Sequence, residues 1–212
     1  MYTAPDRQGF VEHIASLTPK NSICIEVGTY RGDFSEMILK NIKPFQLFLV
    51  DTWEVDDKYE YAHEILAQPI TGREEDQTKG MPTSYSTNDD LEIVKEKFSD
   101  EIIKNQVILK KGFSYDVVNE FPDDFFDFIY IDACHLYECV RDDLKMFLPK
   151  LKKNGLMCGH DYMDFRGFAI GSDFGVVRAV DEFVVDNDFK WVATTMPNFS
   201  MIQIPDFALK RP

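Results

Sequence analysis

The sequence predicts an α/β protein with a mostly parallel sheet of seven strands that ends in an antiparallel hairpin. Short apolar runs alternate along the chain with segments of helical periodicity, a pattern typical of parallel strands joined by crossover helices. The last two runs are too close in sequence for such a helix, because a parallel return needs about a dozen residues or more. We therefore expect them to pair antiparallel at one edge of the sheet.

The predicted strands are the seven apolar runs, at residues 23–27, 46–50, 107–109, 126–131, 156–158, 191–194 and 200–204. The predicted helices carry apolar residues at spacings of three and four, so that one face of each is apolar. One helix follows Gly32, a second spans residues 91–98 with Asn88 or Asp89 as its N-cap, and a third spans residues 136–148.

The chain of 212 residues is long enough to bury a full core, and we expect a single domain over residues 1–212. Two stretches, 54–88 and 162–174, fit no core element, although a short helix near 59–66 is compatible with the first. Both leave the carboxyl ends of strands, where open α/β sheets bind their ligands. Long loops in compact domains often carry function, so we expect lids over a substrate, with plain surface insertions as the alternative.

The chain is acidic, with 37 acidic and 23 basic residues and a net charge of −14. Most of such a surface repels a polyanion, which argues against nucleic acid as a partner. No apolar stretch is long enough to span a bilayer, and the N-terminus does not resemble a signal peptide. The four cysteines suit reduced thiols. We therefore expect a cytoplasmic protein that binds a small molecule and no membrane, and the sequence leaves open whether it forms a homo-oligomer.

A turn with two glycines follows the first predicted strand. Gly28 and Gly32 bracket this turn, and Glu26 stands two residues before the first of them. The dinucleotide-binding turn, G-x-G-x-x-G, carries an additional middle glycine, and Glu26 would repel a pyrophosphate. An acidic turn of this kind favours a nucleoside with a cationic aminoacyl group. A tight turn without a ligand is the alternative.

The next two strands end in residues suited to a nucleoside. Asp51 ends the second strand, and its carboxylate can accept hydrogen bonds from both hydroxyls of a ribose. Capping of the following turn is the alternative role. Gly112, Phe113 and Ser114 follow the third strand and are predicted to form a wall for an adenine ring, unless Phe113 is a core aromatic.

The fourth strand delivers an acid and an imidazole. Asp132 directly follows residues 126–131, and His135 comes three residues later. Either this pair caps the helix that begins near Leu136, or it does chemistry at the tip of the strand. A zinc site that joins Cys134, His135, Cys139 and His160 matches no common spacing.

Four segments together resemble the class I S-adenosylmethionine-dependent methyltransferases. They are IEVGTYRG, LVDTW, FDFIYIDACHLYECVRDDLKMFLPKLKKNGLMCGHDY and GVVRAVDEFVVD, and the likeness runs from about Ile23 to about Asp186. More narrowly, the chain resembles the small-molecule O-methyltransferases that act on macrolide and aminocoumarin sugars. The resemblance implies a Rossmann-like sheet of seven strands with helices on both faces and a final hairpin. It also implies S-adenosylmethionine as the methyl donor.

The resemblance assigns roles to single residues. The cofactor-binding residues that it implies are Glu26, Gly28, Thr29, Gly32, Asp51, Gly112, Phe113, Ser114 and Asp132. It places a divalent cation on Asp132, His160 and Asp161, although some relatives carry a carboxylate in place of His160. The alternative for His160 is a core histidine, or one that hydrogen-bonds a neighbouring loop without touching a metal. It makes His135 the general base, acting beside Asp132. Oxygen ligands favour Mg²⁺, whereas an imidazole ligand shifts the preference toward Mn²⁺, Fe²⁺ or Zn²⁺.

The resulting hypothesis is metal-assisted methylation of a hydroxyl on a small molecule, such as a sugar or a polyol. A divalent cation would lower the pKa of the hydroxyl, and His135 would take its proton near neutral pH. Three alternatives stay open. They are a nucleoside-binding protein without transferase activity, a metal-dependent hydroxylase, and a nicotinamide-dependent oxidoreductase, against which the missing middle glycine argues.

Overall fold

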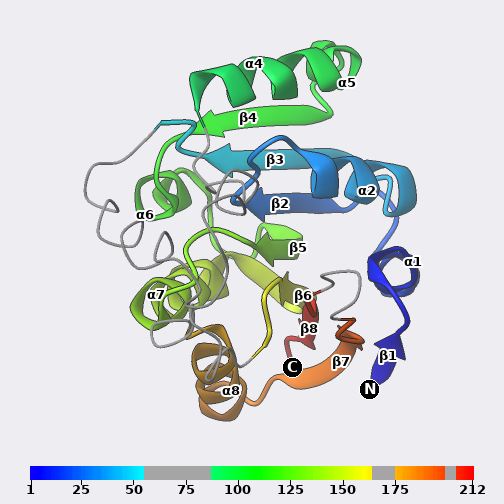
Figure 1. The fold of residues 1–212 in the computed structure, drawn as a ribbon, viewed down its shortest axis with the longest axis vertical. Helices are drawn as coiled ribbons and strands as arrows, with labels where there is room; N and C mark the ends of the chain where they lie inside the picture. Colours follow the sequence, from blue (N-terminus) through cyan, green and yellow to red (C-terminus); the bar gives the residue numbers. More distant parts are fainter. Residues whose placement is uncertain (55–86, 164–174, 199–203) are drawn as a thin grey trace, which may run out of the picture.

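The structure, a computed structural model, describes residues 1–54, 87–163, 175–198 and 204–212. These residues form an eight-stranded sheet in the order β1-β7-β8-β6-β5-β2-β3-β4 (Figure 1). The strands are β1 (Tyr2–Ala4), β2 (Ile23–Val27), β3 (Gln46–Asp51), β4 (Val107–Lys111), β5 (Phe126–Ile131), β6 (Leu151–Gly159), β7 (Lys190–Thr195) and β8 (Phe207–Lys210). β8 runs antiparallel to both of its neighbours, and every other neighbouring pair is parallel. The predicted fold class is confirmed.

Two features of the sheet differ from the prediction. The strand that closes the hairpin is β8, at Phe207–Lys210, and not residues 200–204, of which 200–203 lie outside the described residues. Pro205 and Asp206 obscured this strand in the sequence, but Asp206 is buried among hydrogen-bond donors. β1 was not predicted because three residues are too few to show a period. Most of the two predicted lids, and the predicted helix at 59–66, lie outside the described residues.

Helices cover both faces of the sheet (Figure 1). They are α1 (Arg7–Leu17), α2 (Asp33–Asn41), α4 (Asn88–Lys97), α5 (Ser99–Ile103), α6 (Ser114–Val117), α7 (Tyr137–Phe147) and α8 (Val176–Asp186), with 3₁₀ turns η2 (Val118–Glu120) and η3 (Leu148–Lys150). Along β5, Ile129 and Ile131 join the core beneath α7 and α8, whereas Phe128 and Tyr130 join the core beneath α1 and α2. This alternation follows from the two-residue period of a strand.

The N-termini of α4 and α7 show which residues cap these two helices. α4 is capped by Thr87, whose hydroxyl accepts from the Asp90 backbone N–H while the Asp90 carboxylate accepts from the Thr87 backbone N–H. The prediction of Asn88 or Asp89 as this cap is therefore wrong by one or two positions. α7 has Leu136 at its N-cap position and no capping side chain. Asp132 and His135 therefore do not cap this helix.

The sheet order reverses between β5 and β2, because the chain continues from β2 toward β4 on one side and from β5 toward β6 on the other. Open α/β sheets bind ligands at such a point, beyond the carboxyl ends of the strands. Here the tips of the two strands touch. Gly28 has a φ of +91°, and a Cβ at this position would lie 2.0 Å from the backbone oxygen of Asp132. Only glycine fits this contact.

Two further expectations concern the helices and the cysteines. Of the helices in the described part of the chain, none combines the length and the apolar character that crossing a membrane requires. None of the four cysteines forms a disulfide bond, and Cys24 and Cys158 are buried in the core.

Candidate active site

The glycine turn holds a buried acid. The Glu26 side chain lies beneath the turn with 2% of its surface exposed and accepts a hydrogen bond from the Ser35 hydroxyl. Burial raises the pKa of Glu26 to about 8, although the Ser35 hydrogen bond lowers it. Glu26 is therefore mostly protonated at neutral pH in the protein without ligands.

Thr29 and Gly32 belong to the framework of the same turn. Thr29 is buried, and its hydroxyl lies 3.4 Å from the Val50 carbonyl oxygen, to which it donates. Gly32 has a φ of +73°, and a Cβ there would lie 2.6 Å from the Phe98 ring. These residues set the course of the backbone from β2 into α2, at the position where the sequence predicted a cofactor.

Asp51 lies at the tip of β3 and orders the backbone around it. One carboxylate oxygen accepts from the Tyr30 backbone N–H at 2.8 Å, and the other accepts from the Trp53 backbone N–H at 2.9 Å. The alternative role of Asp51, capping of the turn that follows β3, is therefore observed. These bonds fix the orientation of the carboxylate at the tip of β3. Ribose binding stays a prediction.

The predicted adenine wall lies beside Asp51. The Gly112 backbone N–H donates to the Asp51 carbonyl oxygen at 2.9 Å, which joins the tips of β3 and β4. Phe113 is half-buried outside both core clusters and stacks on Tyr115, with ring centroids 5.0 Å apart. The Ser114 hydroxyl donates to Asp143 at 2.5 Å. The alternative of Phe113 as a core aromatic is thus not favoured.

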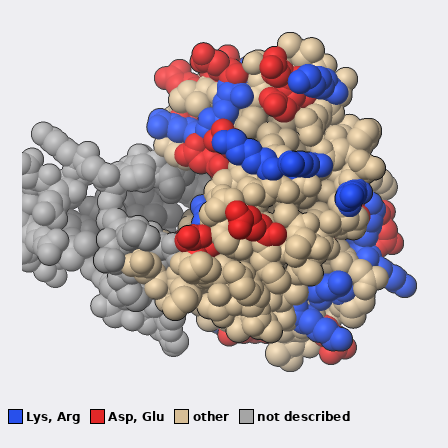
Figure 2. Space-filling view, turned by 90° about the vertical axis from the view of Figure 1, so that its right-hand side faces the viewer, with Lys and Arg blue, Asp and Glu red and all other residues tan. Residues whose placement is uncertain are grey.

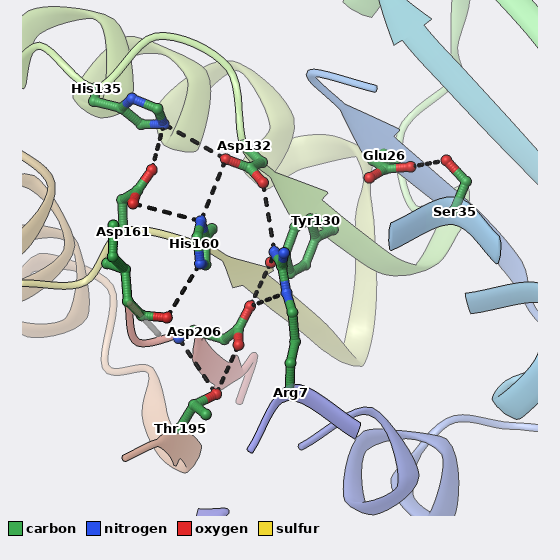
Figure 3. Close-up of polar contacts among 11 residues, drawn as sticks. Arg7, Glu26, Ser35, Tyr130, Asp132, His135, His160, Asp161, Thr195 and Asp206 are labelled. Carbon is green, nitrogen blue, oxygen red and sulfur yellow. Dashed lines mark hydrogen bonds and ion pairs between the residues drawn. The ribbon is translucent and has the colours of Figure 1, made fainter. Parts of the chain in front are cut away.

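Asp132, His135 and Asp161 meet at the carboxyl edge of β5 and β6. Their ligand atoms all lie within 4.8 Å of one another (Figure 3). His135 Nε2 is 2.7 Å from Asp161 Oδ2 and 3.5 Å from Asp132 Oδ1. The residues come from two loops that follow neighbouring strands, so the strand pairing brings them together.

His160 faces the same two carboxylates. Its Nδ1 lies 3.4 Å from Asp161 Oδ1 and 3.8 Å from Asp132 Oδ1, whereas its Nε2 lies 3.1 Å from the Ile204 carbonyl oxygen. Nε2 donates to the Ile204 carbonyl oxygen, so His160 bonds a neighbouring loop, and Nδ1 faces the two acids. Burial lowers the pKa of His160, but the hydrogen bond to Asp161 and the charge of Asp132 outweigh this effect and raise that pKa. The role of His160 as a cation ligand stays a prediction.

The acids and histidines of this cluster shift one another's pKa values. Burial lowers the pKa of His135, but hydrogen bonds to Asp132 and Asp161 and their negative charges outweigh this effect and raise it to about 10. Burial raises the pKa of Asp161, but hydrogen bonds from His135 and His160 outweigh it and hold that pKa far below its ordinary value. In the absence of a cation, protonated His135 thus balances the carboxylates.

A polar network behind Asp132 was not predicted from the sequence. Arg7 Nη2 lies 3.5 Å from Asp132 Oδ2, and Arg7 Nε donates to Asp206 Oδ1 at 3.0 Å (Figure 3). Asp206 also accepts from the Tyr130 hydroxyl at 2.5 Å and from the Thr195 hydroxyl at 2.7 Å. A tyrosine in an apolar central strand was the one sequence signal, because a buried hydroxyl needs a partner. It did not indicate which partner.

These features define a class of protein. A parallel sheet that receives its last strand antiparallel, with a glycine turn at the point where the strand order reverses and an acid at the neighbouring tip, is the class I methyltransferase fold. A sequence model of a family described as "Methyltransferase domain" matches residues 25–162. The chain belongs to this family of methyltransferase domains.

Solved structures of diverse methyltransferases share the fold. The O-methyltransferase from Bacillus cereus in complex with SAH has 12% sequence identity and a TM-score of 0.59, over 99% of this chain and 82% of that one. The N-methyltransferase NodS from Bradyrhizobium japonicum WM9 has 11% identity and a TM-score of 0.60, over 97% and 94%. The tRNA methyltransferase TrmK of B. subtilis has 8% identity and a TM-score of 0.59, over 100% and 68%. No curated protein matches the sequence.

Proposed function

We propose that this chain transfers a methyl group from S-adenosylmethionine to a hydroxyl of a small molecule, such as a sugar or a polyol, with the help of a divalent cation. The observation that carries this proposal is the meeting of Asp132, His135 and Asp161 at the carboxyl edge of β5 and β6, beside the switch point of a methyltransferase fold. The tip of β5 touches the glycine turn, so this cluster borders the position proposed for the cofactor. Holding a methyl donor and a hydroxyl side by side at this edge would favour transfer between them.

The donor set fits a divalent cation. Asp132 and Asp161 offer carboxylate oxygens, and His160 Nδ1, which faces both acids, offers a nitrogen, so that His135 is left to act as the proton acceptor. Two carboxylates with one imidazole suit Mn²⁺ or Mg²⁺, and the nitrogen favours the former. When bound, such a cation would lower the pKa of a hydroxyl and stabilise the alkoxide.

His135 is the proposed proton acceptor, and the structure constrains when it can act. With a pKa of about 10 it is protonated at neutral pH, and a protonated imidazole cannot accept a proton. The two carboxylates that raise its pKa are also the proposed cation ligands. We therefore expect His135 to lose its proton when a cation takes over these carboxylates, because metal binding and proton release are linked.

The charge of the chain supports a small acceptor over RNA. The net charge is −14, and on the face drawn in Figure 2 the basic side chains are interspersed with acidic and uncharged ones. An RNA-binding surface needs a continuous basic area to neutralise phosphates.

The test is transfer of labelled methyl from S-adenosylmethionine to a panel of glycosides and polyols, with and without excess chelator. We expect a labelled methyl ether that chelator abolishes, with S-adenosylhomocysteine affinity retained. Asp161→Asn should abolish turnover and weaken Mn²⁺ binding, whereas Asp186→Asn, which changes an exposed acid at the end of α8, should do neither. Turnover that persists in excess chelator would remove the cation from the mechanism, and label on an amine or on RNA would remove the hydroxyl.

A further inference from the structure

The cofactor-binding residues predicted from the sequence include no cationic partner for the carboxylate of the proposed cofactor. Its methionyl end carries an α-ammonium and an α-carboxylate, and burying an unpaired carboxylate is costly. The charged residues predicted around the glycine turn from the sequence are Glu26, Asp51 and Asp132, all acids. They suit the ammonium and the sulfonium. Arg31 lies in the turn itself, but Asp90 engages it, since Arg31 Nε donates to that carboxylate at 2.6 Å. We therefore expect the anion receptor elsewhere in the fold.

Arg7 lies at the right place for this receptor. It is in the first turn of α1, which follows β1 and therefore starts at the carboxyl edge of the sheet. Its guanidinium carbon is 4.5 Å from the centre of the Phe34 ring, in the first turn after the glycine turn. Its Nη2 is 3.5 Å from Asp132 Oδ2. The guanidinium thus contacts both sides of the switch point, at the methionyl end of the proposed cofactor site.

Hydrogen bonds fix the Arg7 guanidinium and occupy only some of its N–H groups. Nε donates to Asp206, and Nη2 donates to the Tyr130 hydroxyl, which itself donates to Asp206 (Figure 3). For Nη1, the described residues offer no hydrogen-bond acceptor. The Arg7 side chain is 31% exposed. A rigid guanidinium with a free outer N–H group matches the geometry of a carboxylate and keeps its charge at every physiological pH.

We propose that Arg7 binds the α-carboxylate of the methionyl group of S-adenosylmethionine. This inference rests on the proposed cofactor, and it requires neither the proposed cation nor the proposed hydroxyl acceptor. Asp206 and Tyr130 are proposed as positioning residues, because they fix the guanidinium directly, and Thr195 supports them by donating to Asp206. The contact with Asp132 joins the receptor to the acid cluster.

The test compares two ligands by calorimetric titration without added cation. One is S-adenosylhomocysteine, and the other is its decarboxylated analogue, which keeps the ammonium and lacks the carboxylate. We expect the protein to prefer S-adenosylhomocysteine. We expect Arg7→Met to weaken S-adenosylhomocysteine binding by about ten- to a hundredfold, the range of a charge-assisted hydrogen bond, and to change binding of the analogue by less than about threefold.

Arg211→Met is the matched control. Arg211 is 23% exposed, and its guanidinium pairs with Asp124 and donates to the Leu151 carbonyl oxygen, at the other end of β6. This variant should leave both affinities unchanged. If Arg7→Met does not fold, Arg7→Lys keeps the charge without the fork, and it should weaken S-adenosylhomocysteine binding while sparing the analogue.

Three results would overturn the inference. Equal affinity of the unmodified protein for the two ligands would show that the carboxylate has no receptor. Equal weakening of both ligands by an Arg7 variant would leave Arg7 a structural role alone. Failure of the unmodified protein to bind S-adenosylhomocysteine at all would refute the proposed cofactor together with this inference, whereas loss of the metal or hydroxyl proposals alone would leave the titrations unchanged.

Discussion

The substitution Glu26→Gln tests whether the acid beneath the glycine turn is protonated in the folded protein. Glutamine has nearly the same shape and still accepts the hydrogen bond from Ser35, but it does not titrate. The folded-state pKa of Glu26 is about 8, against an ordinary value of 4.5. Between these two pH values the unfolded chain releases this proton and the folded chain keeps it. The group therefore lowers the free energy of unfolding as pH rises from 4.5 to 8, and its effect is constant above 8.

The magnitude follows from the size of the shift. The slope is about 1.4 kcal/mol per pH unit. At pH 7, about 2.5 units above the ordinary value, ionisation of Glu26 in the unfolded chain costs about 3 kcal/mol of stability. The Gln variant does not carry this cost, so its stability relative to the unmodified protein should increase steadily from pH 5 to pH 7.5.

Urea denaturation at several pH values measures this difference. Glu96→Gln, which removes an exposed carboxyl on α4, is the control, and its curve should run parallel to that of the unmodified protein. Parallel curves for Glu26→Gln as well would refute the reasoning, because they would mean that Glu26 ionises equally in the folded and unfolded chain. The same variant should also weaken S-adenosylhomocysteine binding if the carboxylate faces the ammonium of the ligand.

Further predictions concern the turn, the cluster and a helix cap. Gly28→Ala should cost more than about 3 kcal/mol or prevent folding, because its Cβ would overlap the backbone of Asp132, whereas Gly9→Ala, with its nearest neighbour a proline side chain at 3.3 Å, should be tolerated in thermal unfolding. NMR titration should find His135 protonated at pH 8 and show its pKa lowered in Asp161→Asn; an unchanged pKa would disprove the coupling. The charge of His135 stabilises the fold below about pH 6.5, and this contribution is lost as pH rises through about 10. Thr87→Ala should cost about 1 kcal/mol in chemical denaturation as α4 loses its cap, and a neutral result would contradict the assignment of the cap.

The elements predicted best from the sequence are those whose pattern is local. β2 and β5 were predicted at their observed bounds, because both are central strands whose apolar runs contain only one acid each. The resemblance placed Asp132 and Asp161 on one cation, and the structure brings these acids together, because residues that end neighbouring parallel strands meet at one edge of the sheet.

What the sequence did not reveal depends on contacts between distant segments. Arg7 lies in an exposed-looking first turn, and Asp206 follows a proline near the other end of the chain. Neither residue has a local pattern that points to the other, and only the fold brings them together beside Tyr130. The resemblance named His160 as the cation ligand, whereas His135 is the imidazole closer to both carboxylates. This difference depends on loop geometry and side-chain rotamers, which no spacing encodes.

The bond between Arg7 and Asp206 joins residues 199 positions apart, and β1 pairs with β7 across a comparable stretch of chain. A ribosome delivers α1 long before it delivers β8, so during synthesis the arginine has no acid to hold it. Contacts this remote in sequence are slow to form, since closing the intervening loop costs entropy before any bond repays it. The glycine turn between β2 and α2 can assemble early from neighbouring segments. Arg7 would be fixed only when β8, the final strand, has been inserted. If Arg7 binds the carboxylate as proposed, the protein would become able to bind all of S-adenosylmethionine only late in folding.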